Sequence, residues 1–100
     1  MNKYRKGYRL EREITNLCRK QGWVAYGSRG SHSPIDVTAW NPKTMRSRIF
    51  QCKNTEMTQR QADKLAIKIK KESGLHTVFG KVEFYLVCKI KGEGVKWVAI

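Results

Sequence analysis

The order of apolar and polar residues predicts two amphipathic helices. Residues 7–21 carry apolar side chains at helical spacing, and Gly22 follows as a helix stop. A second helical stretch begins after Thr58, with Gln61 three residues later as in a capping box, and is ended by Gly74. The apolar stripes comprise Leu10, Ile14, Leu17 and Cys18 in the first helix and Ala62, Leu65, Ala66 and Ile69 in the second.

Segments rich in β-branched and aromatic residues predict strands around the second helix. They are residues 23–26, 35–40, 48–53, 82–90 and 95–100. Residues 27–34 lack periodicity and are expected to form a loop, and residues 41–43 and 92–94 are expected to turn the chain. The order α-β-β-β-α-β-β predicts a mixed α/β (α+β) fold, with helices packed on one sheet. Because there is no repeat or linker, residues 1–100 are expected to form a single domain.

The turn after residue 40 is expected to bring an acid and a lysine together. A hairpin centred near residues 43–45 sets Asp36 opposite residues 51–53, to within one position. Gln51 and Lys53 then project from one face, while Cys52 points into apolar packing. The simpler alternative is an exposed cross-strand ion pair, which contributes less than about 1 kcal/mol.

The first helix offers two more acids. Glu11 and Glu13 lie on opposite flanks of its apolar stripe, and either could reach the sheet. Periodicity does not choose between them. For Glu13 we favour a surface ion pair with a basic neighbour, the candidates being Arg9, Arg12 and Lys20.

The charge balance indicates a polyanionic partner. The chain has 21 Lys and Arg against 8 Asp and Glu, a formal net charge of +13, and nucleic acid is the commonest polyanion inside a cell. The alternative is a protein that is basic without binding a polyanion. Its charges would then be expected to form ion-pair networks, but the acids in this chain are too few to balance the bases. A membrane partner is disfavoured because the basic residues are spread along the chain.

The cysteines and the N-terminal residues are typical of an intracellular protein. Cys18, Cys52 and Cys88 are widely spaced and show no zinc pattern, so they are expected to be reduced core thiols. The first ten residues contain no apolar signal core. We therefore expect a cytoplasmic protein without a membrane association.

Three sequence segments resemble a known family. RKGYRLEREI, GSRGSHSPIDV and IFQCKN are similar to the archaeal Holliday-junction resolvases of the PD-(D/E)xK nuclease superfamily. The resemblance implies a restriction-endonuclease-like fold and a structure-specific DNA endonuclease for recombination and repair. It also implies a homodimer that makes paired nicks in four-way junctions, uses Mg²⁺ (or Mn²⁺) and needs no small-molecule cofactor. A compact resolvase would suit an archaeon, or a virus acting in its host's cytoplasm.

The same resemblance assigns roles at the site. The implied catalytic residues are Glu11, Ser31, Asp36, Gln51 and Lys53, and the implied metal ligands are Glu11, Asp36, Gln51 and the Cys52 carbonyl. Such oxygens hold a hard cation that polarises phosphate and activates water, and an ammonium stabilises charge on phosphorus. Two departures stand out. Ile35 separates the proline from the acid, and Gln51 stands where the family has Glu, which predicts weaker metal binding.

Basic residues are expected to follow the DNA backbone without reading its sequence. The candidates are Lys3, Arg5, Lys6, Arg9, Arg29, Arg46, Arg48, Arg60 and Lys64. Phe79, Phe84 and Trp97 could form a dimer surface or belong to the core, and for Phe84 we favour the core. Three alternatives stay open: a flap or replication-repair nuclease of the same superfamily, a non-catalytic DNA-binding protein, and a ribonucleoprotein component with exposed aromatic residues.

Overall fold

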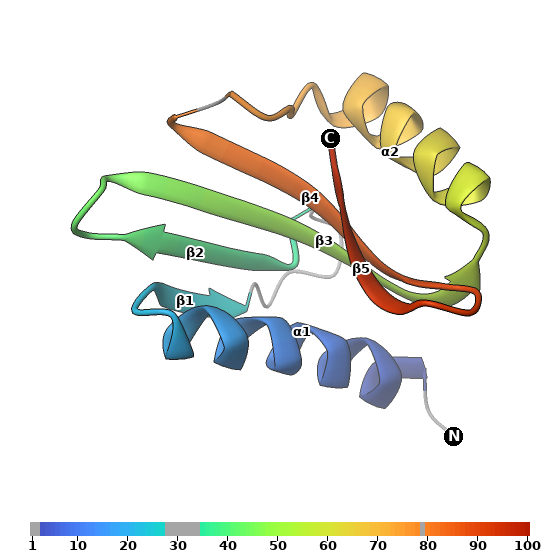
Figure 1. The fold of residues 1–100 in the computed structure, drawn as a ribbon, viewed down its shortest axis with the longest axis horizontal. Helices are drawn as coiled ribbons and strands as arrows, with labels where there is room; N and C mark the ends of the chain where they lie inside the picture. Colours follow the sequence, from blue (N-terminus) through green and yellow to red (C-terminus); the bar gives the residue numbers. More distant parts are fainter. Residues whose placement is uncertain (1–2, 28–34, 79) are drawn as a thin grey trace.

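The described part of the chain folds into one five-stranded sheet with two helices (Figure 1). The computed structural model describes the backbone of residues 3–27, 35–78 and 80–100 and, within these ranges, the side chains from Arg9 onward. Its elements are α1 (Lys3–Lys20), β1 (Val24–Gly27), β2 (Val37–Asn41), β3 (Arg46–Met57), α2 (Gln59–Ser73), β4 (Val82–Ile90) and β5 (Gly94–Ala99). This order confirms the predicted α-β-β-β-α-β-β arrangement.

The sheet is mixed, with strands in the order β1-β2-β3-β4-β5. Neighbouring strands are antiparallel except β3 and β4, which are parallel and are joined through α2. A parallel pair requires a crossover connection, and the second helix supplies it. The sheet therefore consists of two antiparallel arms that meet at one parallel pair.

The two helices cover opposite faces at different halves of the sheet (Figure 1). Helix α1 packs on β1, β2 and β3, where Leu10, Ile14 and Cys18 form a core with Val37 and Phe50. Helix α2 packs on β4 and β5, and its core is formed by Ala62, Ala66, Ile69, Phe84, Leu86, Cys88 and Ile90. Strand β4 alternates between these cores, as side chains of a strand buried on both faces must. Each face of the sheet therefore keeps one half without a helix.

The ends of the helices follow the sequence signals. Thr58 Oγ1 accepts a hydrogen bond from Gln61 N, and the Gln61 side chain accepts one from Thr58 N, which completes the capping box. Gly74 follows α2 in the left-handed conformation with φ of 73°, where a side chain would be strained. Gly22 has φ of 87° after α1. The predicted start of α2 and both helix stops are confirmed.

Several boundaries differ from the predictions. Helix α1 begins at Lys3 rather than residue 7. Residues 3–6 contain no helix breaker, so the helix can include them, but they carry no apolar stripe that would have indicated the earlier start. Strand β2 begins at Val37, which leaves Ile35 and Asp36 ahead of it. Strand β3 runs from Arg46 to Met57, beyond the predicted Arg48–Lys53, because pairing with β4 continues along its polar ends. The pattern of apolar and polar residues within β3 does not reveal that it pairs with β4.

Two of the three cysteines are core residues. Cys18 and Cys88 are fully buried, Cys52 is half-buried against the α1 core, and all three are free thiols. This confirms the expectation of reduced thiols in apolar packing. Phe84 is likewise buried, as favoured from the sequence, and Trp97 packs at the edge of the α1 core.

Candidate active site

The pairing of β2 with β3 places Asp36 beside the centre of β3. Val37 pairs with Phe50, so Asp36 comes opposite Gln51, within the predicted range. The Asp36 N–H donates to the Phe50 carbonyl at 2.8 Å, and the Cys52 N–H donates to Asp36 Oδ2 at 2.7 Å. The carboxylate is therefore held by the β3 backbone, independently of any ion pair.

Alternation along β3 separates the residues around Asp36. The side chains of Phe50 and Cys52 pack in the core under α1. Gln51 and Lys53 therefore face the other side of the sheet, as predicted. Burial raises the pKa of Asp36, while the Cys52 hydrogen bond and the Lys53 charge act in the opposite direction. Lys53 thus interacts electrostatically with Asp36, although its side chain stays exposed.

Glu11 is the helix acid that reaches this place. Its Oε2 lies 4.0 Å from where a Cβ on Gly27 would stand, and the Asp36 carbonyl lies 3.6 Å from the same point. Burial, and then the Asp36 charge, raise the pKa of Glu11. Glu13 lies on the other flank of α1 and forms no ion pair with any residue that the structure describes. Of the two helix acids between which periodicity could not choose, Glu11 is therefore the one that lies near Asp36. The surface ion pair favoured for Glu13 is wrong.

Gly27 was missed as a site residue because its sequence context indicated only a loop. It ends β1, and its backbone passes close to both acids. A glycine directly after a short strand is the signal that could have indicated such a close approach.

Gln51 contributes an oxygen without a partner. Its Oε1 is buried and accepts no hydrogen bond from any residue in the described ranges. Buried acceptors are almost always satisfied, so this atom fits a site completed by a cation or water. The carboxylates of Glu11 and Asp36, whose pKa values are raised, and the Gln51 amide all offer oxygen, the type of donor that Mg²⁺ and Mn²⁺ prefer. The described ranges contain no cluster of three His, Cys, Asp or Glu residues that could hold a metal ion.

The Cys52 thiol is a poor nucleophile here. Burial raises its pKa, and the charges of Asp36 and Glu11 raise it further. A protonated thiol neither attacks nor binds a metal well. The relevant groups of Cys52 are therefore its backbone N–H and carbonyl.

The structure does not bring the predicted basic residues together around Asp36. Arg46 and Arg48 lie at the opposite end of β3, and both pair with Glu83, at 3.7 and 3.0 Å. Arg48 also stacks over Trp23, with its guanidinium carbon 4.2 Å from the ring centroid. Its guanidinium is thus engaged within the protein. The side chains of Arg9 on α1 and of Arg60 and Lys64 on α2 are exposed.

Other predicted residues lie outside the described part of the chain. They are Arg29, Ser31 and Phe79, together with the side chains of Lys3, Arg5 and Lys6.

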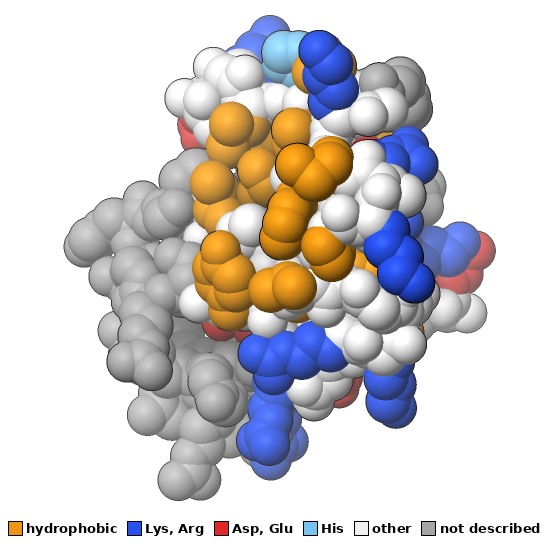
Figure 2. Space-filling model, turned by 90° about the vertical axis from the view of Figure 1, so that its left-hand side faces the viewer, with side chains coloured by type: hydrophobic (Ala, Val, Ile, Leu, Met, Phe, Trp, Pro, Cys, Tyr) orange, Lys and Arg blue, Asp and Glu red, His pale blue; other side chains and the backbone are white. Residues whose placement is uncertain are grey.

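One end of the molecule combines apolar and basic side chains (Figure 2). Hydrophobic side chains gather near its middle, with Lys and Arg around them. Val24, Tyr26 and Trp40, from β1 and β2, keep 48%, 58% and 39% of their surface exposed, in the part of the sheet that α2 does not cover.

No helix of the described ranges is long and apolar enough to cross a membrane.

The fold and this arrangement of residues define a class of protein. A helix acid, an acid ahead of the second strand and a Gln-x-Lys strand on one mixed sheet are the arrangement of a PD-(D/E)xK nuclease. Within this class, a family model described as archaeal Holliday junction resolvase (hjc) matches residues 2–100. The chain belongs to this family and is therefore a nuclease that resolves Holliday junctions.

A solved structure supports the fold assignment. It is that of Hjc, a Holliday junction resolvase from the archaeal hyperthermophile Archaeoglobus fulgidus, with a TM-score of 0.56. The two sequences are 20% identical, and the match covers 94% of this chain and 72% of that one. Comparison with curated protein sequences gives no significant match.

Proposed function

We propose that residues 1–100 act as one nuclease domain that hydrolyses phosphodiesters in four-way junctions with a divalent cation, Mg²⁺ in the first place and Mn²⁺ as the alternative. The observation that carries this proposal is the buried, unpartnered Oε1 of Gln51 on the residue opposite Asp36. An oxygen in this position needs a partner, and a cation would also offset the cost of ionising the two neighbouring half-buried acids, Glu11 and Asp36. Two copies acting as a homodimer would make the paired nicks that a two-fold junction requires.

The proposed ligands are Glu11, Asp36, the Gln51 amide oxygen and the Cys52 carbonyl. A bound divalent cation supplies Lewis-acid polarisation of the phosphate and lowers the pKa of water. The β3 backbone orients Asp36 through the Cys52 N–H, which fixes one carboxylate oxygen and leaves the other available. Lys53, exposed and electrostatically coupled to Asp36, is the proposed donor to the charge that develops on the phosphate.

The proposed path for the DNA backbone follows exposed cations. It includes Arg9, Arg60 and Lys64, and from the sequence alone Lys3, Arg5, Lys6 and Arg29. Arg46 and Arg48 are left out because both pair with Glu83 at the far end of β3. Ser31 remains proposed as an active-site residue on the resemblance alone.

The test is cleavage of a labelled immobile four-way junction, with matched linear duplex and flap substrates, in Mg²⁺, Mn²⁺ or EDTA. The decisive variant is Asp36→Asn, which keeps an acceptor for the Cys52 N–H and removes the charge. We expect symmetric nicks in the junction that depend on metal and fall at least about a hundredfold in Asp36→Asn.

The matched control is Asp63→Asn, which removes an exposed acid on α2 and should cleave normally. Preferential cutting of flaps would move the protein to another branch of the superfamily. Tight junction binding without cutting in either metal would contradict the proposed catalysis and favour a DNA-binding module.

A further inference from the structure

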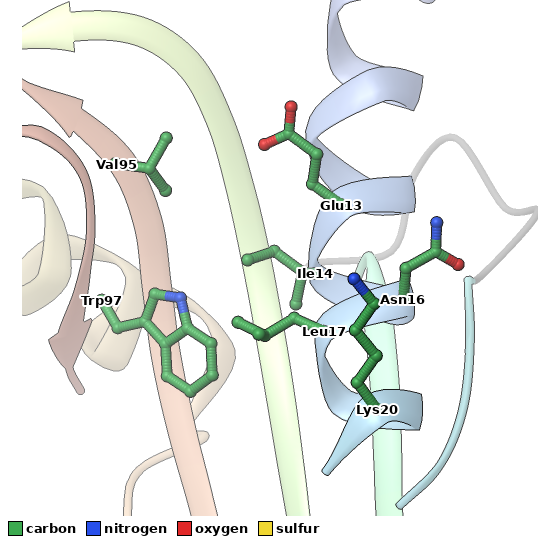
Figure 3. A pocket seen from close by; sticks show the side chains of 7 residues that line it. All are labelled: Glu13, Ile14, Asn16, Leu17, Lys20, Val95 and Trp97. Atoms are coloured by element: carbon green, nitrogen blue, oxygen red, sulfur yellow. The ribbon is translucent and has the colours of Figure 1, made fainter.

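A groove lies between α1 and β5, on the flank of α1 opposite to Glu11 (Figure 3). It has a volume of about 480 Å³, and Ile14, Leu17, Val95 and Trp97 form its apolar lining. Ile14 and Leu17 point from the helix towards Trp97 on β5. Leu17 and Val95 keep 40% and 42% of their surface exposed. The groove therefore offers apolar surface that the described part of the chain leaves open.

The groove is open because α1 covers only part of its face of the sheet. The helix packs on β1, β2 and β3. Trp97 pairs with Val87, whose side chain belongs to the α1 core, so Val95 and Trp97 project towards the face that carries α1. Helix α2 packs on the other face of β5. The side chains of Val95 and Trp97 thus form the sheet side of the groove.

Strand β5 is also the last strand of the sheet. Among the described residues, only β4 pairs with it as a strand. The Ile100 N–H donates to the Phe84 carbonyl at 2.8 Å, and the direction of backbone hydrogen bonding alternates along an antiparallel strand. The backbone N–H and C=O groups of Val95, Trp97 and Ala99 therefore point away from β4. These groups are free to pair with a further strand along the groove.

The edge of β5 has few of the features that prevent strand addition. Proteins protect exposed edges with proline, bulges and charged side chains. Strand β5 contains no proline, and its pairing with β4 keeps one register throughout. Its one charged residue, Lys96, pairs with Glu93 at 3.0 Å. The edge is therefore regular and suited to receive an extended chain.

The charges around the groove favour a peptide over DNA. Glu13 and Lys20 are the charged residues of its lining. Glu13 would repel phosphates, and the apolar side chains offer them no hydrogen bonds. A peptide can match both signs and can also pair with the β5 backbone. The net charge of +13 further favours an acidic partner.

We propose that β5 and this groove bind an extended segment of another protein, which adds one strand to the sheet. Apolar side chains at alternate positions of the segment would enter the groove between Leu17 and Trp97, and an acidic residue would lie beside Lys20. The segment would lie on the flank of α1 opposite to Glu11, so a bound partner leaves Glu11 and Asp36 open to DNA. The chain could thus be recruited by a partner while it acts on a junction.

The test begins with a phage-displayed library of random nine-residue peptides, selected on the immobilised full chain in EDTA. Enriched peptides should alternate apolar and polar residues and carry an acid near one end. Hydrogen exchange with a saturating enriched peptide then reports the mode of binding. The amides of Val95 and Trp97 should exchange at least about tenfold more slowly, because they gain partners. The amide of Lys96, which faces β4, should change less.

Two variants remove different parts of the proposed contact. Leu17→Glu places a charge in the apolar groove, and Val95→Pro removes an N–H that faces the free edge while leaving the bonds to β4 in place. Each should weaken peptide binding by about tenfold or more in fluorescence anisotropy, and Lys20→Glu should weaken it at least about threefold. Ile67→Glu is the matched control, because it changes an exposed aliphatic residue on α2, 58% exposed, and should bind normally.

The proposal is overturned if selection enriches no peptide over the bare support, or if the enriched peptides bind Leu17→Glu and Val95→Pro like the parent. It is also overturned if Leu17→Glu weakens junction binding as much as peptide binding, since the groove would then be a DNA site. Sedimentation equilibrium supplies the last check. A parent dimer that Leu17→Glu converts to monomers would assign the groove to a second copy of the chain instead.

Discussion

Opposing influences act on the ionisation of Asp36. Burial disfavours its charge, whereas the Cys52 N–H and the Lys53 ammonium favour it. Burial and the Asp36 charge both disfavour ionisation of the neighbouring Glu11. Two acids arranged in this way cost stability when both are charged, and the proposed divalent cation would offset that cost. The raised pKa values of Glu11 and Asp36 therefore support the proposed metal site.

The first prediction concerns stability against pH. Because the folded-state pKa of Glu11 is raised, the folded chain holds its proton more tightly than the unfolded chain. The protonated acid's contribution to stability is full below the unfolded pKa of about 4 and is lost as pH rises through the folded pKa. Glu11→Gln should therefore gain melting temperature relative to the parent as pH rises from about 4 to 7.

Thermal unfolding in EDTA measures this difference. Glu72→Gln, which neutralises an exposed acid on α2, should show no such pH-dependent gain. At neutral pH, Mg²⁺ should raise the melting temperature of the parent more than that of Glu11→Gln. A difference between parent and Glu11→Gln that is constant across pH would contradict the raised pKa.

The second prediction concerns the amide at position 51. Gln51→Glu adds a third carboxylate to the donor set, so the Mg²⁺ concentration for half-maximal junction nicking should fall about tenfold. Without metal the same variant should melt at a lower temperature near neutral pH, because three acids then repel one another. Calorimetric titration with Mn²⁺ measures the affinity directly. Gln21→Glu adds the same charge directly after α1, beside Arg48, and should leave the affinity for Mg²⁺ and Mn²⁺ unchanged.

At the scale of elements, α2 is the connection that makes β3 and β4 parallel. Its start is fixed by the reciprocal hydrogen bonds of Thr58 and Gln61 and its end by Gly74. We predict that Thr58→Ala lowers the free energy of unfolding by about 1 kcal/mol, the usual cost of a lost N-cap. Urea unfolding followed by circular dichroism measures it. Thr44→Ala, in the exposed β2–β3 turn, should lower the free energy of unfolding by less. Equal losses in the two variants would show that the Thr58 cap contributes no more stability than an exposed threonine in a turn.

The sequence predicted the elements well because their signals are local. Helix caps, the turn after residue 40 and the apolar stripes all depend on residues within a few positions of each other. The β2–β3 hairpin was predictable for the same reason, and with it the meeting of Asp36 and Gln51. The family resemblance then selected Glu11 from two acids that periodicity could not separate.

Contacts between distant segments were not predictable in this way. The extension of β3 to Met57 depends on pairing with β4, and Arg48 finds its partner Glu83 on that same strand. The groove beside β5 likewise needs α1 and the last strand to lie together. Such arrangements leave no local pattern, so the sequence alone indicates neither the Glu83 pair of Arg48 nor the position of Glu13 in a groove.

At the scale of the whole molecule, the net charge of +13 should make junction binding strongly salt-dependent. We predict that Arg60→Ala and Lys64→Ala each reduce the slope of log affinity against log salt by about one. Arg48→Ala should leave that slope unchanged and lower the free energy of unfolding by about 1–2 kcal/mol. It removes the Glu83 pair, which is mostly buried, and the stacking on Trp23.

Affinity measured by fluorescence anisotropy at several salt concentrations, together with urea unfolding, separates these roles. The comparison keeps the charge change constant at one unit per variant. A reduced salt slope in Arg48→Ala would return that residue to the DNA path.

The pairing of β2 with β3 also makes the number of paired residues between the turn and Asp36 a determinant of activity. A residue inserted within the strands shifts their register by one and turns Gln51 and Lys53 to the α1 face, while Cys52 takes their place beside Asp36. A residue inserted in the turn at positions 42–45 leaves both strands in register and should be tolerated. Homologous chains would then be free to vary in turn length but not in the number of paired residues between turn and acid. An alignment that conserves residue types while misplacing a gap by one position would put the wrong side chains in the active site.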